Sequence, residues 1–422
     1  MSACHRFLFR FVVSTWLLFV AIAPVFAQLS SPRMGSALST ERQPALRPAI
    51  QTADSILGAN QPADSIRHAL LPYSRYNTDE GLYAGLMWNR YHYDTRLAPY
   101  RNLTEFRLQA STGGVLRSRV SHERLPSGGQ GLRIRAEAIA ERLLDDRFYG
   151  IGNQSDYNAA LEQAGWYGFA SWMGSVAVQI RRPVSERRRF GWMGSDVRVD
   201  HQLLTGMRFY RVMEKEPAES LLFSSFGQVH DRSWAPYIGY GLIADSRDSE
   251  TDPSQGIYAS GSVVVVPWFG SRSPASIWQG EVRGYYTFEA LRGTILAGRL
   301  QTAVTMGDRP WWMQPWLGGE ESLRGLPMRR YRGDAMVLHS IALRKWVARL
   351  PVFNSRVGVE LFTDAGRVFT AEDPAASLFH NHHRTWGASV LGSVFVDDFI
   401  GRADIAFWQG RPALYLYLGL YF

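Results

Sequence analysis

The sequence predicts an all-β protein that folds as a closed antiparallel transmembrane β-barrel of about 16 strands. Three observations lead to this prediction: apolar and polar residues alternate from about residue 81 to residue 422, the N-terminus carries an export signal, and the chain ends on an aromatic residue inside a strand. Roughly 345 residues, at about 22 per strand and connection, give the strand number. Because open sheet edges cannot be satisfied in lipid, the barrel has to close.

The alternation is clearest in the last strand, where leucines from Leu414 to Leu420 point one way and Tyr415, Tyr417 and Tyr421 the other. A soluble sandwich would turn the apolar face inward, whereas a membrane barrel turns it outward and keeps charges in a wet lumen. Aromatic residues near expected strand ends favour the membrane, because they would form an interfacial girdle. They are Trp88, Tyr91, Tyr93, Trp166, Tyr167, Trp172, Trp268, Trp311, Trp312 and Trp316.

Residues 1–27 have the pattern of a secretory signal peptide. Arg6 and Arg10 precede an apolar run, and Val25 and Ala27 supply the small residues before a cleavage site. Cleavage would remove Cys4, the single cysteine, so no disulfide and no cysteine-based metal site is expected. Residues 28–75 are predicted to be a linker with one short helix, 64–71. The short stretch 63–71 could plug the lumen or dock a partner. The barrel is expected over residues 76–422.

Composition and motif searches exclude several classes of function. With 46% hydrophobic and 13% aromatic residues the chain is too apolar to be disordered. A net charge of +8 on an exported protein does not indicate nucleic-acid binding. The run 380–383, which reads HNHH, is expected to be a polar loop, and Asp245, Asp248 and Asp252 to be turn residues rather than calcium ligands. No catalytic, cofactor or metal site is therefore predicted, and the protein is not expected to be an enzyme.

The most specific pattern lies at residues 317–333, which read LGGEESLRGLPMRRYRG; residues 359–369 follow as VELFTDAGRVF. Together they resemble the C-terminal barrel of the BamA/TamA-like bacterial surface antigen family. In that family a long loop carries an Arg-Gly-aromatic motif back into the lumen, and a later strand carries Phe-x-Asp-x-Gly. The segments 146–153 and 245–256 agree with the family as well. The similar segment 282–285, which reads VRGY, lacks the Gly-Gly lead-in and is expected to be ordinary strand.

These residues suggest a structural lock between the inward-folded loop and the barrel wall. Phe362 and Asp364 are two apart, so they share one face of a strand. A partly desolvated Arg324 would need a carboxylate and would gain from an aromatic ring. Gly325 and Gly366 would allow the backbones to approach closely. The alternative is that Arg324 is a solvated loop arginine.

The resemblance also carries expectations for the C-terminal region. Five strands are expected after the loop, at 335–347, 354–366, 385–396, 399–408 and 412–422. The last one resembles the assembly signal of such barrels, with Tyr417, Gly419, Leu420 and Phe422 as its key residues. Three departures stand out: Leu326 replaces the usual aromatic, Ala342 replaces a usual Glu, and a leader of about 48 residues is too short for POTRA domains.

The resemblance implies a protein of the bacterial outer membrane that helps to insert or translocate proteins or lipids at a seam between its first and last strands. The alternative is a passive pore or a structural barrel, alone or as an oligomer, that has lost client recruitment; an outer-membrane hydrolase is the least favoured reading. Expected partners are outer-membrane lipid, the barrel assembly machinery for the protein's own insertion, and either a separate periplasmic partner or a second copy. Nucleic acid and cofactors are not expected.

Overall fold

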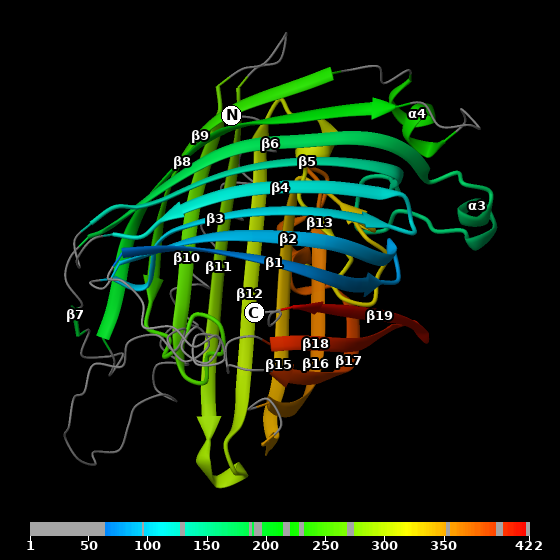
Figure 1. Ribbon diagram of the computed structural model, residues 1–422. Coiled ribbons are helices and arrows are strands. Elements are labelled where there is room, and N and C mark those ends of the chain that lie inside the picture. The colour runs from blue at the N-terminus through cyan, green and yellow to red at the C-terminus, as the bar shows by residue number, and fades with distance from the viewer. Residues whose placement is uncertain are drawn as a thin grey trace.

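Sixteen long strands form a closed antiparallel β-barrel in the computed structural model (Figure 1). The structure describes residues 64–94, 97–126, 131–184, 188–189, 196–213, 220–227, 232–267, 274–351, 355–393 and 400–418. The barrel strands are β1 (Asp64–Asn77), β2 (Gly81–Asp94), β3 (Leu97–Ser111), β4 (Val115–Arg124), β5 (Arg133–Arg147), β6 (Gly168–Pro183), β8 (Asp196–Met213), β9 (Arg232–Asp245), β10 (Gly256–Val266), β11 (Ala275–Phe288), β12 (Thr294–Gly307), β15 (Ala335–Leu350), β16 (Ser355–Phe369), β17 (His383–Ser393), β18 (Ile400–Trp408) and β19 (Arg411–Leu418).

Each long strand pairs with the next one along the chain, and the circle closes where β19 returns to β1. The closing register joins Tyr76 to Leu416 and Asn77 to Tyr415. Strand β7 (Arg188–Arg189) pairs with the start of β8, and β13 (Trp316–Leu317) pairs with β14 (Tyr331–Arg332) apart from the barrel. The predicted sixteen-stranded architecture is therefore confirmed.

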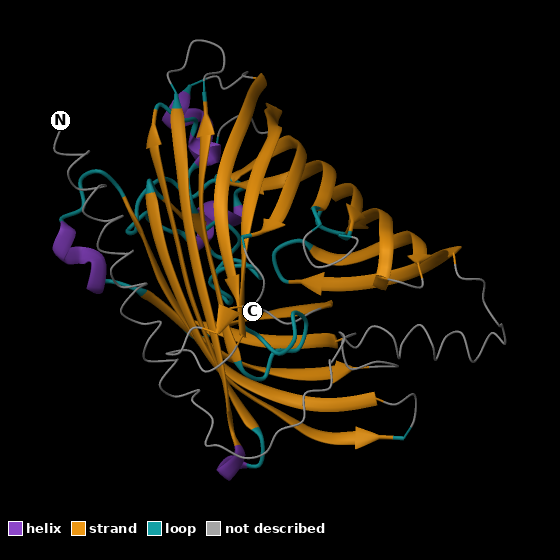
Figure 2. Cartoon of the chain, turned by 90° about the vertical axis from the view of Figure 1, so that its left-hand side faces the viewer, coloured by secondary structure: helices purple, strands orange, loops and turns teal. Residues whose placement is uncertain are grey.

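In the part of the chain that the structure describes, the helices are short and lie in the connections between strands (Figure 2). They are α3 (Ala159–Gln163), α4 (Leu221–Phe226) and the 3₁₀ turns η1 (Glu289–Leu291), η2 (Trp311–Met313) and η4 (Ala375–Phe379). The Asn158 side chain caps α3 by accepting from the amides of Ala160 and Leu161. Within the described residues, none of the helices has the length and apolar character that a membrane crossing would require.

The strands place apolar side chains outside the barrel and charged ones inside it. On β16 the exposed fraction is 63% for Leu361 but 1% for the neighbouring Glu360. The last strand follows the same rule, since Leu414 and Leu416 are exposed whereas Tyr415 is buried. Inside, arginines pair with carboxylates from neighbouring strands, as Arg299 does with Glu281. An apolar exterior around a polar lumen is the arrangement of a membrane barrel.

The two ends of the barrel differ in the length of their connections. Because the number of strands is even, the start of β1 and the end of β19 lie at the same end of the barrel, here called the terminal end. Most connections at the terminal end are short. The opposite end, here called the loop end, carries the three longest connections, 148–167, 214–231 and 308–334.

The structure corrects the expectation for the start of the barrel. Residues 64–77 form β1 and pair with β2 along their whole length, so the helix expected at 64–71 is wrong. Ile66, His68 and Leu70 alternate with less exposed neighbours, which is the period of a strand. The barrel thus begins at residue 64 rather than 76. The signal peptide predicted at 1–27 lies outside the described residues.

The other strand predictions need smaller adjustments. The five strands expected after the long loop are present as β15 to β19, with ends that differ by a few residues. Of the expected assembly signal, Tyr417 lies on β19, whereas Gly419, Leu420 and Phe422 fall outside the described residues. Tyr167 and Trp311 are buried in connections at the loop end, and Trp312 packs against the buried cluster that contains Trp311. These aromatics therefore do not belong to a lipid-facing girdle.

Candidate functional site

The candidate site is the connection 308–334, a loop that leaves β12 at the loop end and folds into the barrel. Its two arms pair as β13 and β14, with Trp316 opposite Arg332 and Leu317 opposite Tyr331. The Gly319 amide donates to the Leu326 carbonyl and closes the tip. Apolar residues of the tip pack against the wall in one buried cluster that contains Leu317, Leu323, Leu326, Leu338, Val368 and Trp408. The loop is therefore held as a rigid hairpin against the wall.

Arg324 at the loop tip is fully buried and bound to two carboxylates. Its Nε and Nη2 donate to the two Asp364 oxygens at 2.7 and 2.9 Å, and Nη1 donates to Asp404 at 3.3 Å. The guanidinium lies 3.4 Å from the centre of the Phe362 ring. A planar guanidinium suits this bidentate and stacked geometry, which a lysine could not reproduce. The contacts expected between Arg324, Asp364 and Phe362 are thus present, and Arg324 is not a solvated arginine.

Two glycines permit this close approach. Gly325 has φ +94°, and a Cβ there would lie 3.4 Å from Ala406 and from the Phe407 backbone. A Cβ on Gly366 would meet the Val337 carbonyl at 2.8 Å and the Leu317 side chain at 3.0 Å. The first glycine allows the tip to turn beside β18, and the second allows the loop arm to lie against β16.

Behind Arg324 the buried charges continue as an alternating series. Asp404 accepts from Arg402 Nε at 2.6 Å, and Arg402 Nη2 donates to Glu360 at 2.7 Å and to Ser389 at 2.9 Å. The other Glu360 oxygen accepts from Arg344 Nε at 2.9 Å. Each arginine here faces a carboxylate, which offsets the cost of removing both charges from water.

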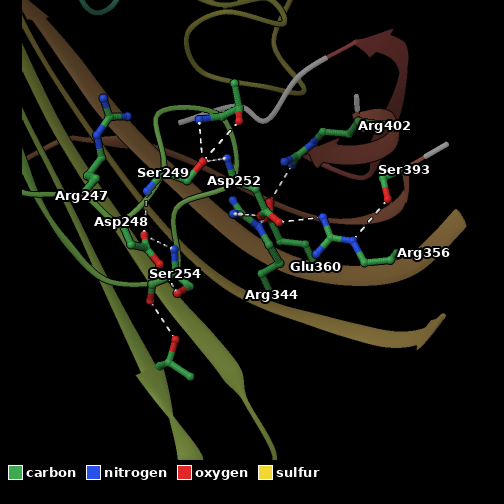
Figure 3. A network of polar contacts seen from close by, with 12 residues as sticks. Arg247, Asp248, Ser249, Asp252, Ser254, Arg344, Arg356, Glu360, Ser393 and Arg402 are labelled. Carbon is green, nitrogen blue, oxygen red and sulfur yellow. Dashed lines mark hydrogen bonds and ion pairs between the residues drawn. The ribbon is translucent and has the colours of Figure 1, made fainter. Parts of the chain in front are cut away.

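The series ends on a connection at the terminal end of the barrel. Asp252, on the β9–β10 turn, accepts from Arg356 Nη2 at 2.9 Å and lies 3.9 Å from Arg344 Nη1 (Figure 3). Asp248 stabilises this turn by accepting from the amides of Ser249, Ser254 and Gln255. The aspartates of this segment therefore act as turn and ion-pair residues, in agreement with the turn chemistry expected for them.

The loop also contacts the first hairpin of the barrel. Glu320 accepts from Arg75 Nη1 at 2.8 Å and from Asn77 Nδ2 at 3.4 Å. The Asp79 carboxyl accepts a hydrogen bond from the Met328 amide. On the neighbouring strand β19, the Gly325 amide donates to the Tyr415 hydroxyl at 2.9 Å. One loop tip therefore reaches both the first and the last strand.

Comparison with known proteins decides the family. The model of the Omp85 superfamily domain matches residues 175–397, which is more than half of the chain. The chain belongs to the Omp85 superfamily. No curated protein sequence matches it. Among solved structures, the barrel is similar to BamA from Haemophilus ducreyi lacking POTRA domains 1–3, at 14% identity and TM-score 0.56, over 94% of this chain and 81% of that one.

CdiB from Escherichia coli is similar to a comparable degree, with 10% identity and TM-score 0.56 over 94% of this chain and 74% of that one. At these identities the likeness shows the fold alone. Membership of the Omp85 superfamily makes this chain an outer-membrane barrel. The described residues form the barrel and its connections, and no POTRA-like domain lies among them.

Two of the departures noted in the sequence are explained by packing in this Omp85 barrel. Leu326 takes the place of an aromatic and is buried in the apolar cluster of the loop. Ala342 takes the place of a Glu and lies opposite Phe362 in the β15–β16 register. Ala342 and Phe362 belong to one buried cluster with Tyr285 and Tyr415, so the small Ala342 leaves room for the Phe362 ring under Arg324.

The other sequence candidates have structural contacts. His383 stacks on Tyr331 with ring centroids 3.8 Å apart, and His382 Nε2 faces the Leu378 carbonyl. Arg283, in the segment resembling the motif, lies on β11 and donates to Glu281, as expected for ordinary strand. Sequence reasoning missed Asp404 as the second partner of Arg324, and it missed the charges on the wall behind it, Glu360, Arg402 and Arg344. The alternation of β16 gives the only signal, because it places Glu360 on the same face as Phe362 and Asp364.

Burial affects the acidic groups around the loop tip. It raises the pKa of Glu320, against the effect of Arg75 and with a further contribution from Glu80. Burial also raises the pKa of Asp79 to about 7, although the Met328 amide and Arg147 act against it. The ionised carboxylates at this tip therefore carry a desolvation cost that their partners offset only in part.

We predict that Asp79→Asn changes how stability depends on pH. A carboxyl with a raised folded-state pKa binds its proton more tightly in the folded state, so stability falls as pH rises from about 4 to about 7 and is level above that. The urea midpoint of the wild type in lipid vesicles should fall relative to Asp79→Asn over this window. Parallel curves for the two proteins between pH 4 and pH 8 would show that Asp79 does not titrate there.

Proposed function

We propose that this Omp85 barrel inserts or translocates polypeptides at the outer membrane through the seam between β1 and β19. The observation that carries the proposal is the pairing of these strands. Strand β1 pairs with β2 over its full length, from Asp64 to Asn77, whereas its described pairing with β19 joins two residue pairs at the loop end. Among the described residues the seam has few main-chain bonds, and such a seam is the part of the wall that opens at least cost.

The orientation in the membrane follows from the connections. Outer-membrane barrels have short periplasmic turns and longer extracellular loops. The loop end would then face outward and the terminal end the periplasm. A client strand arriving from the periplasm would meet the terminal end of β1 first, which is the part of the seam farthest from the described pairs. Such a strand could add to the edge by main-chain hydrogen bonds.

The proposal assigns no catalytic residue and no cofactor to the chain. It assigns client recruitment to a separate periplasmic partner, and it places outer-membrane lipid and the barrel assembly machinery as the surroundings in which the protein itself is inserted. The second candidate, a passive pore, is less favoured because the loop 308–334 folds into the barrel and is bonded to the wall at β1 and at β16. A hydrolase has no comparable support.

A photo-crosslinking amino acid at defined outward positions tests the proposal. We expect position 70 on β1 and position 416 on β19 to capture precursors of outer-membrane proteins or a periplasmic partner in living cells. The matched control is position 238 on β9, which is similarly exposed but lies far from the seam in strand order. Capture of lipid or of the protein itself at all three positions would contradict the proposal and favour the passive barrel.

A further inference from the structure

The loop tip contacts two residues that face each other across the seam. Asn77 on β1 and Tyr415 on β19 are register partners. Glu320 accepts from the Asn77 side chain, and the Gly325 amide donates to the Tyr415 hydroxyl at 2.9 Å. Both Asn77 and Tyr415 are buried, so these contacts lie on the lumen side of the seam. Two loop residues, Glu320 and Gly325, thus bridge the two strands, whose main chains share few bonds among the described residues.

The described main-chain bonds of the seam lie at the same level. The Thr78 amide donates to the Leu414 carbonyl at 3.1 Å, and the Leu414 amide donates to the Thr78 hydroxyl at 2.7 Å. Asn77 is fixed in turn by the β1–β2 turn, because its side chain donates to Glu80 at 2.8 Å and accepts from the Glu80 amide at 2.6 Å. The loop therefore holds the seam where its main-chain pairing is also made.

The attachments of the loop to the last strands and to the first strand differ in strength. On the side of the last strands, Arg324 makes three charge-assisted bonds to Asp364 and Asp404 in a fully buried site. On the side of the first strand, Glu320 is held by Arg75 and Asn77, and the Arg75 side chain keeps 17% of its surface exposed. Buried bidentate pairs break less readily than partly hydrated ones. When the seam opens, the loop should stay with β16 and β18 and separate from β1.

We propose that the tip of the loop is a clamp across the β1–β19 seam, and that Glu320 is the positioning residue that holds the first strand. The inference deepens the proposed function, since it says what controls the opening through which clients would pass. It concerns the seam itself, however, and its test does not depend on any client. Besides the bond from the Met328 amide to Asp79, it is the hold of Glu320 on Arg75 and Asn77 that keeps β1 at the loop.

Hydrogen–deuterium exchange of the purified protein in lipid nanodiscs tests the clamp. In Glu320→Ala we expect the amides of residues 73–83 and 411–418 to exchange about tenfold faster than in the wild type, because removing one partner leaves Arg75 and Asn77 without their tie to the loop. Exchange in β11 and β12 should stay unchanged. The matched control is Glu321→Ala, which removes the same charge from the adjacent exposed position.

Further variants test whether the same contact is responsible. Arg75→Ala should reproduce the effect, and the double variant with Glu320→Ala should be no faster than either single one, because both remove the same contact. If Glu320→Ala does not assemble, Glu320→Gln keeps the side-chain volume and should show a smaller increase. A disulfide between Tyr76→Cys and Leu416→Cys, in a chain with Cys4→Ser, should restore slow exchange in Glu320→Ala when oxidised.

Three results would overturn the clamp: wild-type exchange at the seam in Glu320→Ala, an equal increase in Glu321→Ala, or an equal increase in β11 and β12. The first would show that the contact holds nothing, the second that only local charge matters, and the third that the variant is generally destabilised. A responsive seam combined with no client capture at positions 70 and 416 would leave the clamp in place and contradict the proposed function instead.

Discussion

Arg324→Ala is expected to release the loop from the wall and to destabilise the folded barrel by about 3–5 kcal/mol, because it leaves Asp364 and Asp404 as buried carboxylates with a partner removed. The variant should lose much of its heat-modifiable gel mobility. Trypsin should then cut the loop after Arg329 or Arg330, of which Arg330 is buried in the intact loop.

The control for this prediction is Arg384→Ala, which removes an arginine from an exposed position at the start of β17. It should behave like the wild type in both assays. Arg324→Lys should give an intermediate result, since lysine keeps the charge but cannot make the bidentate contact or stack in the same way on Phe362. Wild-type mobility and protease resistance in Arg324→Ala would show that the contact does not act as a lock.

Glu360→Ala should have the second-largest effect, because one side chain serves two buried arginines. Its oxygens accept from Arg344 at 2.9 Å and from Arg402 at 2.7 Å. Removing the carboxylate leaves Arg344 with Asp252 at 3.9 Å and Arg402 with Asp404 and Ser389. We expect a loss of about 3–5 kcal/mol, since breaking a buried pair from one side leaves an uncompensated charge.

The measurement is the urea midpoint of unfolding in lipid vesicles, followed by the loss of the compact gel band. Glu372→Ala is the control, because Glu372 lies exposed in the connection between β16 and β17. Glu360→Gln should recover part of the lost stability, as its amide oxygen still accepts a bond and its volume is nearly that of Glu. If Glu360→Ala unfolds at the midpoint of Glu372→Ala, the charge series behind Arg324 does not contribute to stability.

The local pattern of residues was sufficient to predict the architecture and the contacts of Arg324 with Phe362 and Asp364, but not its contact with Asp404. Alternation fixes which side chains share a face, so the pairing of Phe362 with Asp364 and the outward leucines of β19 were predictable. The inward loop was predictable from the resemblance carried by residues 317–333. The helix expected at 64–71 is wrong, because the exposure of these residues alternates with the period of a strand and they pair with β2.

What only the tertiary structure decided are the contacts between strands far apart in the chain. Asp404 lies eighty residues from Arg324, and no local pattern says that β18 stands beside the loop tip. In the same way, Glu320 meets Arg75 only because the barrel closes and brings the first strand back beside the last. The sequence by itself determined the alternation of the strands, the face on which each side chain lies and the loop motif, because these depend on neighbouring residues. Closure of the barrel and insertion of the loop determined the partners of Arg324 and Glu320, because these depend on which distant strands come together.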